Sequence, residues 1–304
     1  MITILIINKQ VRRLLATTLA LILLLGACGG SDQPQGLTVV ATTTMLGDVV
    51  GNVVGENAQV VTLLPIGADP HDFQLSARQV ATLNEADLVV ANGLGLEGPM
   101  NENLSTAVSD GANLLVVGPL LDPLRLGDND DPHVWIDPLR MADAASAIAS
   151  EMTLIDNSVD WADRAEVYGV ELLELDAEIQ RVLSVVAEDD RKLITNHEFL
   201  RYFANSYNFT VGGTVFPGGA SPVNPSSAYL ADLVTTMQAE EAEVIFAEAG
   251  EPTALAETVA DEVGGDVQVV ELFIGSLGQP GSGAENLIDM LLANARRIAE
   301  ALGS

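Results

Sequence analysis

Residues 37–55, "LTVVATTTMLGDVVGNVVG", begin with a β-branched run and continue with apolar residues at helical spacing. Short β-branched runs are typical of buried strands, and an apolar pattern that repeats every three to four residues predicts a helix. The stretch therefore predicts a strand followed by a helix, the unit from which parallel sheets are built. In the same half of the chain, strands are predicted at 58–65, 87–95 and 113–120, and a helix at 76–86.

The same alternation returns in the second half of the chain. Strand-like runs occur at 192–197, 209–216, 243–248 and 267–273, and helical patterns at 198–208, 226–242, 252–263 and 284–302. Two such halves predict an α/β fold of two lobes with mainly parallel sheets. Because open α/β sheets bind ligands beyond the carboxyl ends of their strands, a cleft between the lobes is the expected binding place.

Between the halves, one apolar stripe recurs at alternating intervals of four and three residues: Trp161, Ala165, Tyr168, Leu172, Leu175, Ile179, Val182 and Val186. This spacing keeps the stripe on one face of a helix. A helix from Ser158 to Glu188 would extend roughly 45 Å at about 1.5 Å per residue, enough to join two lobes rigidly. We therefore expect an N-terminal lobe at 37–157, a linking helix at 158–189 and a C-terminal lobe at 190–304.

The N-terminus resembles a targeting segment. Lys9, Arg12 and Arg13 precede the apolar run "LLATTLALILLLGA", which ends immediately before Cys28, the single cysteine. Basic residues before a short apolar segment predict a secretory signal peptide, here residues 1–27. "LGAC" resembles a bacterial lipobox, so Cys28 is expected to be lipidated and residues 28–36 to form a polar tether. The protein is then extracytoplasmic and reaches the membrane only through its lipid anchor.

The chain of 304 residues is strongly acidic, with a formal net charge of −30. Nucleic acids and anionic membrane surfaces both need basic patches on a partner, so the charge excludes these two classes of ligand. An acidic surface favours cations and also keeps a secreted protein soluble.

Three histidines, the only ones in the sequence, stand where a binding site is expected. His71 and His133 each follow an Asp-Pro dipeptide in a loop, and His197 ends the strand-like run "KLITNH". Imidazole nitrogen suits zinc and other late transition metals. Any one of these histidines could be an ordinary solvated or packed residue. Their joint placement at strand ends predicts a metal site formed by His71, His133 and His197.

Three carboxylates are candidates for a fourth ligand or for orienting a histidine. Glu248 and Glu251 lie in "FAEAGEP" after a predicted strand, and Asp137 follows His133 in "HVWIDP". Asp137 could equally cap the helix expected to start at Pro138. Water is as good a candidate for the fourth position as any of the three.

The chain resembles the solute-binding lipoproteins of bacterial zinc and manganese ABC importers, the metal-binding clade of periplasmic-type binding proteins. Successive motifs carry the resemblance in order: "VATTTMLGDVV", "DPHDFQLSARQV", "NGLGLE", "DPHVWIDP", "TNHEFLRYFANSYNF", "NPSSAYLADL", "VIFAE" and "ELFIGSLGQPGSGAENLIDMLLANARRI". The resemblance implies two α/β lobes joined by one rigid helix, with metal in the cleft. It implies that His71, His133 and His197 are metal ligands. It also implies a monomer that works with a membrane permease and its ATPase subunit.

The sequence departs from the family pattern at two ligand positions. Manganese-binding members usually carry glutamate where this chain has His197, so the resemblance implies zinc rather than manganese as the transported ion. Many members supply an aspartate from a "TDS" stretch before the last helix. This chain reads "LFIGS" there, and Ile274-Gly275 removes the carboxylate.

Two alternative functions remain at this point. A zinc hydrolase is one, because three protein ligands and an open fourth position are what catalytic zinc uses to activate water. The sequence has no HExxH motif and no nucleophile motif, which favours a binding protein over an enzyme. A surface adhesin is the other, and no residue pattern supports or excludes it.

Overall fold

The computed structural model describes residues 36–218, 223–265 and 267–303. The expected signal peptide at 1–27, Cys28 and the tether up to residue 35 lie outside the described residues. Within the described residues, no helix is both long enough and apolar enough to cross a membrane.

The first half of the chain contains four strands with helices between them. The strands are β1 (Leu37–Ala41), β2 (Ala58–Thr62), β3 (Leu88–Ala91) and β4 (Leu114–Val116), and the helices are α2 (Thr44–Val54), α3 (Ala77–Asn84) and α4 (Asn101–Ser109). A short hairpin of β5 (Arg125–Leu126) and β6 (Asn129–Asp130) follows, and then come α5 (Pro138–Ile155) and α6 (Trp161–Leu183).

The second half repeats this order of elements. Its strands are β7 (Lys192–Thr195), β8 (Thr210–Thr214), β9 (Val244–Glu248) and β10 (Gln268–Leu272), and its helices are α7 (Arg201–Tyr207), α8 (Ser227–Ala239), α9 (Ala254–Val263) and α10 (Leu287–Leu302). All eight strands predicted from the sequence are present. Helix α4 and the β5–β6 hairpin were not predicted.

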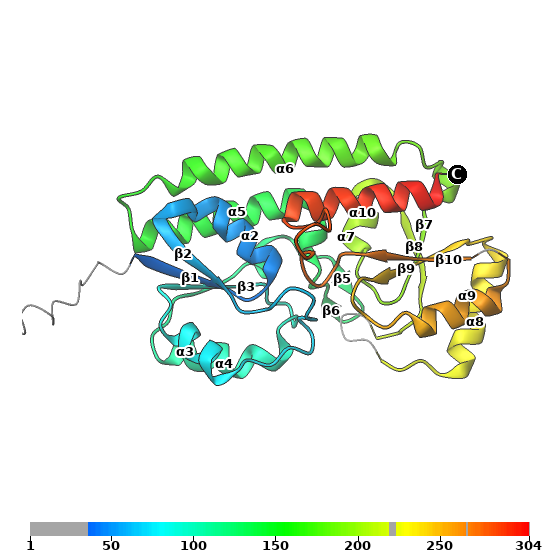
Figure 1. Cartoon of the computed structure of the whole chain (residues 1–304), viewed down its shortest axis with the longest axis horizontal. Coiled ribbons are helices and arrows are strands. Elements are labelled where there is room, and N and C mark those ends of the chain that lie inside the picture. Colours follow the sequence, from blue (N-terminus) through cyan, green and yellow to red (C-terminus); the bar gives the residue numbers. More distant parts are fainter. Residues whose placement is uncertain (1–35, 219–222, 266, 304) are drawn as a thin grey trace, which may run out of the picture. The chain divides into compact units, whose positions relative to one another are not determined.

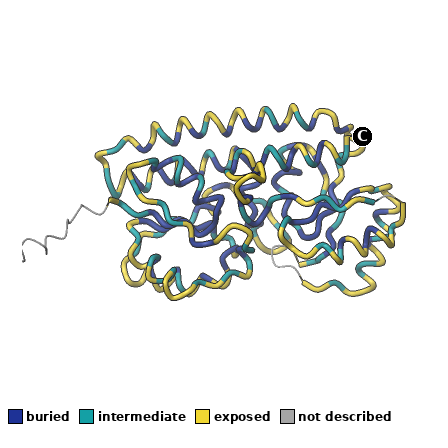
Figure 2. The backbone as a smooth tube through the Cα atoms, in the orientation of Figure 1, coloured by how far each residue is buried: buried dark blue, intermediate teal, exposed yellow. Residues whose placement is uncertain are grey.

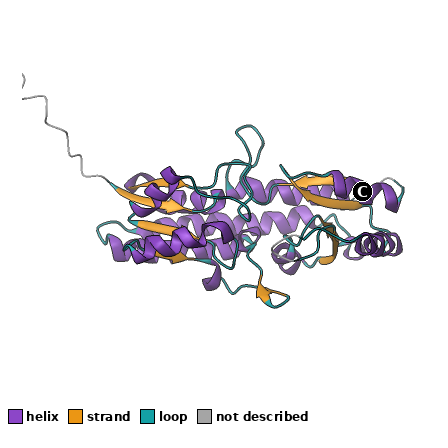
Figure 3. Cartoon of the chain, turned by 90° about the horizontal axis from the view of Figure 1, so that it is seen from below, coloured by secondary structure: helices purple, strands orange, loops and turns teal. Residues whose placement is uncertain are grey.

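The two four-stranded sheets share one topology. The strand orders are β2-β1-β3-β4 and β10-β9-β7-β8, and every pairing in both sheets is parallel. If the strands of each sheet are numbered from one in chain order, both sheets have the order 2-1-3-4, the second read from β8 to β10. The two halves therefore have the same strand topology. Figures 1 and 3 show the two groups of strands apart from each other, with helices beside and between them. The α/β class with parallel sheets is therefore confirmed.

Alternate residues of the central strands face different cores. In β1, Val39 and Ala41 belong to a large cluster of buried residues, while Val40 belongs to a smaller one on the opposite face. This alternation follows from the two-residue period of a strand. A third cluster covers the outer face of the second sheet under α8 and α9. The large cluster contains buried residues from both sheets and from α2, α5, α6, α7 and α10, so the two halves share one core (Figure 2).

Helix α6 is the expected long helix between the halves, and it is shorter than the sequence indicated. It has 23 residues, and its N-cap Asp160 accepts a hydrogen bond from the backbone of Asp163. At about 1.5 Å per residue it extends about 35 Å, not 45 Å. Its buried face carries most of the predicted stripe, but Leu183 is buried in place of Val182, and Val186 is buried outside the helix.

Helix α10 is a second element that crosses from one half to the other. It follows the last strand of the second sheet, and it packs against α6 and α2 as well as β10 (Figure 1). At its start, the backbone N–H of Leu287 donates to Asp48 of α2 at 3.2 Å. Helices α6 and α10 therefore lie side by side.

Candidate metal centre

His133 is the most deeply fixed of the three histidines. It precedes the short 3-10 helix Val134–Ile136, and 1% of its surface is exposed. Its ring Nδ1 lies 2.7 Å from Oδ1 of Asp131, which is fully buried. Because a carboxylate only accepts hydrogen bonds, Nδ1 carries the proton and Nε2 presents its lone pair. The backbone N–H of His133 donates to the same oxygen at 3.0 Å.

His71 lies in the loop after β2 and is partly exposed. Its backbone N–H donates to Oδ1 of Asp69 at 2.8 Å. Asp69 thus forms with His71 the same backbone contact that Asp131 forms with His133, but no hydrogen bond joins its carboxylate to the His71 ring among the described contacts. The His71 ring is less constrained than that of His133.

His197 comes two residues after β7 and four before α7. The sequence had placed it at the end of the strand and the start of a helix, and the structure separates it from both by a short turn. Its backbone N–H donates to the side chain of Asn196, and its ring packs edge-on against Phe199 with centroids 4.9 Å apart. It is 5% exposed.

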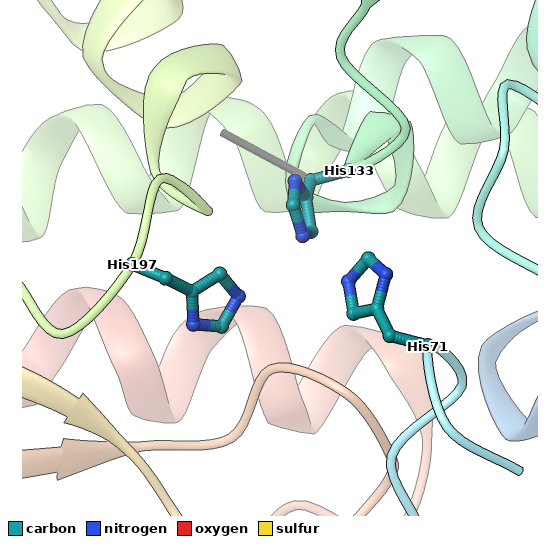
Figure 4. Close-up of side chains that lie close together, drawn as sticks. All are labelled: His71, His133 and His197. Atoms are coloured by element: carbon teal, nitrogen blue, oxygen red, sulfur yellow. The ribbon is translucent and has the colours of Figure 1, made fainter. Parts of the chain in front are cut away.

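The three imidazoles meet at one point, as Figure 4 shows. One donor nitrogen from each ring lies within 4.8 Å of the other two. The ring centroids are 5.5 Å apart for His71 and His133, 5.6 Å for His133 and His197, and 6.1 Å for His71 and His197. Nε2 of both His133 and His197 is buried without a hydrogen-bond partner. Buried polar atoms are rarely left unpaired, so these two nitrogens fit a metal ion as their partner.

Burial keeps the rings of His71 and His197 neutral. Desolvation, and then the proximity of His133, lower the pKa of His71 to about 3. The same two causes, with His71 added, lower the pKa of His197 well below its usual value. Only neutral imidazole coordinates metal, so the site holds these two rings in the form that binds an ion.

A cavity of about 390 Å³ opens beside the histidines. His71, His197 and four carboxylates line it: Asp69, Asp72, Glu248 and Glu251. Burial, followed by the negative charge of Asp69, raises the pKa of Glu248 to about 8. The other carboxylates of this partly closed space attract cations, and the cavity reaches the rings of His71 and His197.

The three carboxylates that the sequence offered as a fourth ligand or as orienting groups differ in burial and in distance from the histidines. Glu248 is buried, and its Oε2 lies 3.8 Å from Nε2 of His197. Glu251 is exposed at the wall of the cavity. Asp137 acts as the cap of α5, one of the two roles expected for it. It accepts hydrogen bonds from the backbone of Leu139 and from the side chains of Arg140 and Ser206.

Asp131 is the site residue that the sequence reasoning missed. A signal was available, because Asp131-Pro132-His133 repeats the tripeptide Asp69-Pro70-His71. An aspartate two residues before a ligand can accept from that residue's own backbone, and a buried one can also hold its ring.

The segment 274–277, which follows β10, contacts the loops that carry His71 and His133. The backbone carbonyl of Ile274 accepts from the indole of Trp135 at 3.0 Å, and Ser276 accepts from the backbone of Gly67 at 2.7 Å. The backbone N–H of Leu277 donates to Thr44 at 2.9 Å. The first two bonds hold the loops of His133 and His71 to the segment after β10, and the third holds the start of α2 to the same segment.

With this fold and this cluster of donors, the chain belongs to the family described as "Zinc-uptake complex component A periplasmic", whose model matches residues 39–301. The match includes α6, all three histidines and both sheets from residue 39 of β1 onward.

Two relatives align with this chain over most of their own length. The chain is 30% identical over 307 residues to "Zinc-binding protein TroA" of Treponema pallidum, covering 95% of this chain and 98% of the relative. It is 29% identical over 272 residues to "Manganese-binding lipoprotein MntA" of Halalkalibacterium halodurans, covering 88% of each. The solved structure of the periplasmic zinc-binding protein TroA from Treponema pallidum superposes with a TM-score of 0.81 at 27% identity, covering 88% of this chain and 99% of that one.

Proposed function

We propose that this protein is the zinc receptor of a bacterial ABC importer and binds one ion through His71, His133 and His197. Its family membership makes it a metal-binding component of metal import rather than an enzyme, which removes the zinc hydrolase as an alternative. Relatives are named for zinc and for manganese, so the choice of ion rests on the donors.

The observation that carries the choice of zinc is the pair of buried, unpaired Nε2 atoms of His133 and His197 in a group of three imidazoles. Nitrogen donors suit zinc, whereas manganese prefers carboxylate, carbonyl and water oxygens. His71 supplies the third donor from the cavity side, and the acidic wall of the cavity attracts the ion.

The test is a comparison of metals on the purified, metal-free protein. Native mass spectrometry should show one bound zinc ion, and competition with a zinc chelator should give a dissociation constant at least about 100-fold lower for zinc than for manganese. The variant Glu171→Gln, on α6 away from the histidines, is the matched control. Tighter binding of manganese than of zinc would overturn the proposal.

We further propose that residues 1–27 are removed as a signal peptide, that lipidated Cys28 anchors the protein outside the cytoplasm, and that a permease with its ATPase subunit accepts the ion. Lipid attachment at Cys28 predicts that Cys28→Ala releases the protein from membranes with its zinc affinity unchanged. Continued fractionation of the variant with membranes would contradict the anchor.

A further inference from the structure

Glu248 is a buried carboxylate at the end of β9, and no lysine or arginine of the described residues forms an ion pair with it. It is 6% exposed, and its only ion-pair neighbour among the described residues is His197. Its nearest charged neighbours beyond that ring are Asp69 and Glu251, both acidic. A buried carboxylate without a partner is costly, and a metal ion would supply the missing positive charge.

The two oxygens of Glu248 have separate surroundings. Oε1 accepts a hydrogen bond from the backbone N–H of Gly275 at 2.8 Å. Oε2 faces Nε2 of His197 at 3.8 Å, and that nitrogen has no hydrogen-bond partner. A separation of 3.8 Å is too long for a hydrogen bond. Two ligands of one tetrahedral zinc, each about 2.1 Å from the ion, lie about 3.4 Å apart, which is close to the observed separation.

Gly275 provides the space that this carboxylate occupies. A Cβ added at position 275 would overlap Oε1 of Glu248 and would press on the ring of Pro70. The φ angle of Gly275 is not in the left-handed region, so its backbone does not itself require glycine. The absence of a side chain at position 275 therefore leaves space for the Glu248 carboxylate, which occupies the volume that a side chain there would fill.

We propose that Glu248 is the fourth zinc ligand, through Oε2, and that Gly275 gives it both the room and the hydrogen bond that orient it. The proposal rests on the three-histidine site of the proposed function. The donor atoms of the three histidines form the compact group, and Glu248 lies at its edge on the His197 side. Rotation of the carboxylate about the Oε1 contact brings Oε2 toward the ion and completes the four ligands that zinc favours.

Glu248→Gln is the first test, because glutamine keeps the size of the side chain and can still accept from Gly275. Zinc affinity should fall by more than about 100-fold, beyond the roughly 10- to 100-fold typical of a residue that only orients a ligand. The visible spectrum of the cobalt-loaded protein should change in position and intensity, because a ligand has been replaced. Glu171→Gln, on the exposed face of α6 away from the cavity, is the control and should change affinity less than about threefold.

An exchange of side chains separates ligation from a structural role. Gly275→Asp alone should weaken zinc binding, because the new side chain overlaps Glu248. Gly275→Asp combined with Glu248→Ala should restore affinity to within about tenfold of the wild type, because one carboxylate again occupies the vacated place. Melting temperatures of the metal-free variants check that each is folded, and if the double variant does not fold, the cobalt spectrum of Glu248→Gln decides.

Two results would overturn the inference: an unchanged cobalt spectrum and affinity in Glu248→Gln, or tighter zinc binding in Gly275→Asp alone. Neither result touches the proposed function as long as the wild type binds zinc and loses it in His133→Ala. Failure of the wild type to bind zinc would instead remove the proposed function.

Discussion

The loops that carry His71 and His133 contain the same tripeptide and differ in what they do with it. In each, the aspartate accepts a hydrogen bond from the backbone of the histidine two residues on. Only Asp131 also holds the ring of its histidine, and Asp131 is fully buried, whereas Asp69 is partly exposed beside the cavity. One local sequence thus gives a fixed ligand on the inner side of the site and a freer one on the outer side.

The largest expected effect comes from removing the rings themselves. His133→Ala and His71→Ala should each weaken zinc binding by far more than 100-fold, because two imidazoles remain. His133→Ala should also lower the free energy of unfolding by about 1–3 kcal/mol, because buried Asp131 loses a hydrogen-bond donor. His71→Ala should leave it nearly unchanged. Chemical denaturation of the metal-free variants measures this difference, and equal losses of stability would contradict the contrast between the loops.

Replacing Asp131 or Asp69 with asparagine tests the difference between the His133 loop and the His71 loop with smaller changes. Asp131→Asn should cost about 10- to 100-fold in zinc affinity, because the carboxylate orients the His133 ring and increases its basicity. Asp69→Asn should cost less than about tenfold, since it alters a contact to the backbone of His71 and one charge of the cavity wall, and no hydrogen bond to the His71 ring. Isothermal titration of both variants gives the comparison directly. A larger loss in Asp69→Asn would show that the outer loop is the more strictly positioned one.

The lowered pKa values of His71 and His197 predict an unusual dependence on pH. Exposed imidazoles would lose zinc as pH falls through about 6.5. Here the folded protein holds both rings neutral well below that value, so protonation of His71 and His197 should not weaken zinc binding between pH 7 and 5.5. Glu248, whose pKa is raised to about 8, must release its proton to bind zinc, so the zinc affinity of the wild type should fall with pH over this range, and Glu248→Gln should remove that fall. The unfolded chain does take up protons below about 6.5, so the stability of the metal-free protein should decrease as pH falls from 6.5 toward 3. A steep loss of zinc affinity near pH 6.5 in Glu248→Gln would contradict the neutral rings.

The smallest effect is expected from the prolines. Pro132→Ala and Pro70→Ala should each lower the free energy of unfolding by about 0.4–1 kcal/mol, because alanine gives the unfolded chain more freedom. Only Pro70→Ala should weaken zinc binding, by a few-fold, because the His71 loop has fewer other bonds to hold it. Titrations of the two variants side by side test this, and a greater loss of affinity in Pro132→Ala would reverse the order.

Local patterns predicted much of this molecule. The β-branched runs located all eight sheet strands, and the stripe from Trp161 to Ile179 located α6. Helix α4 was missed because "NENLSTAVS" has few apolar residues at helical spacing. The end of α6 was misplaced because Val186 is buried by packing after the helix has stopped.

Local sequence patterns also predicted part of the metal site. The three histidines were found from their rarity and their places after strands. The different burial of Asp69 and Asp131 could not be found, because it depends on which distant elements cover each loop. The closeness of Glu248 to Gly275 depends in the same way on how β9 and β10 pair.

The core shared by both sheets has a consequence for how the molecule melts. Because buried side chains of β1, β7, β9 and α6 pack into one cluster, neither half can lose its structure without exposing apolar surface of the other. Heat should therefore disrupt both halves in a single cooperative transition, seen as one calorimetric peak. A bound ion touches only a few side chains, yet it then stabilises the entire chain. At a free concentration a thousandfold above its dissociation constant, the ion adds about 4 kcal/mol to the free energy of unfolding and so raises the melting temperature.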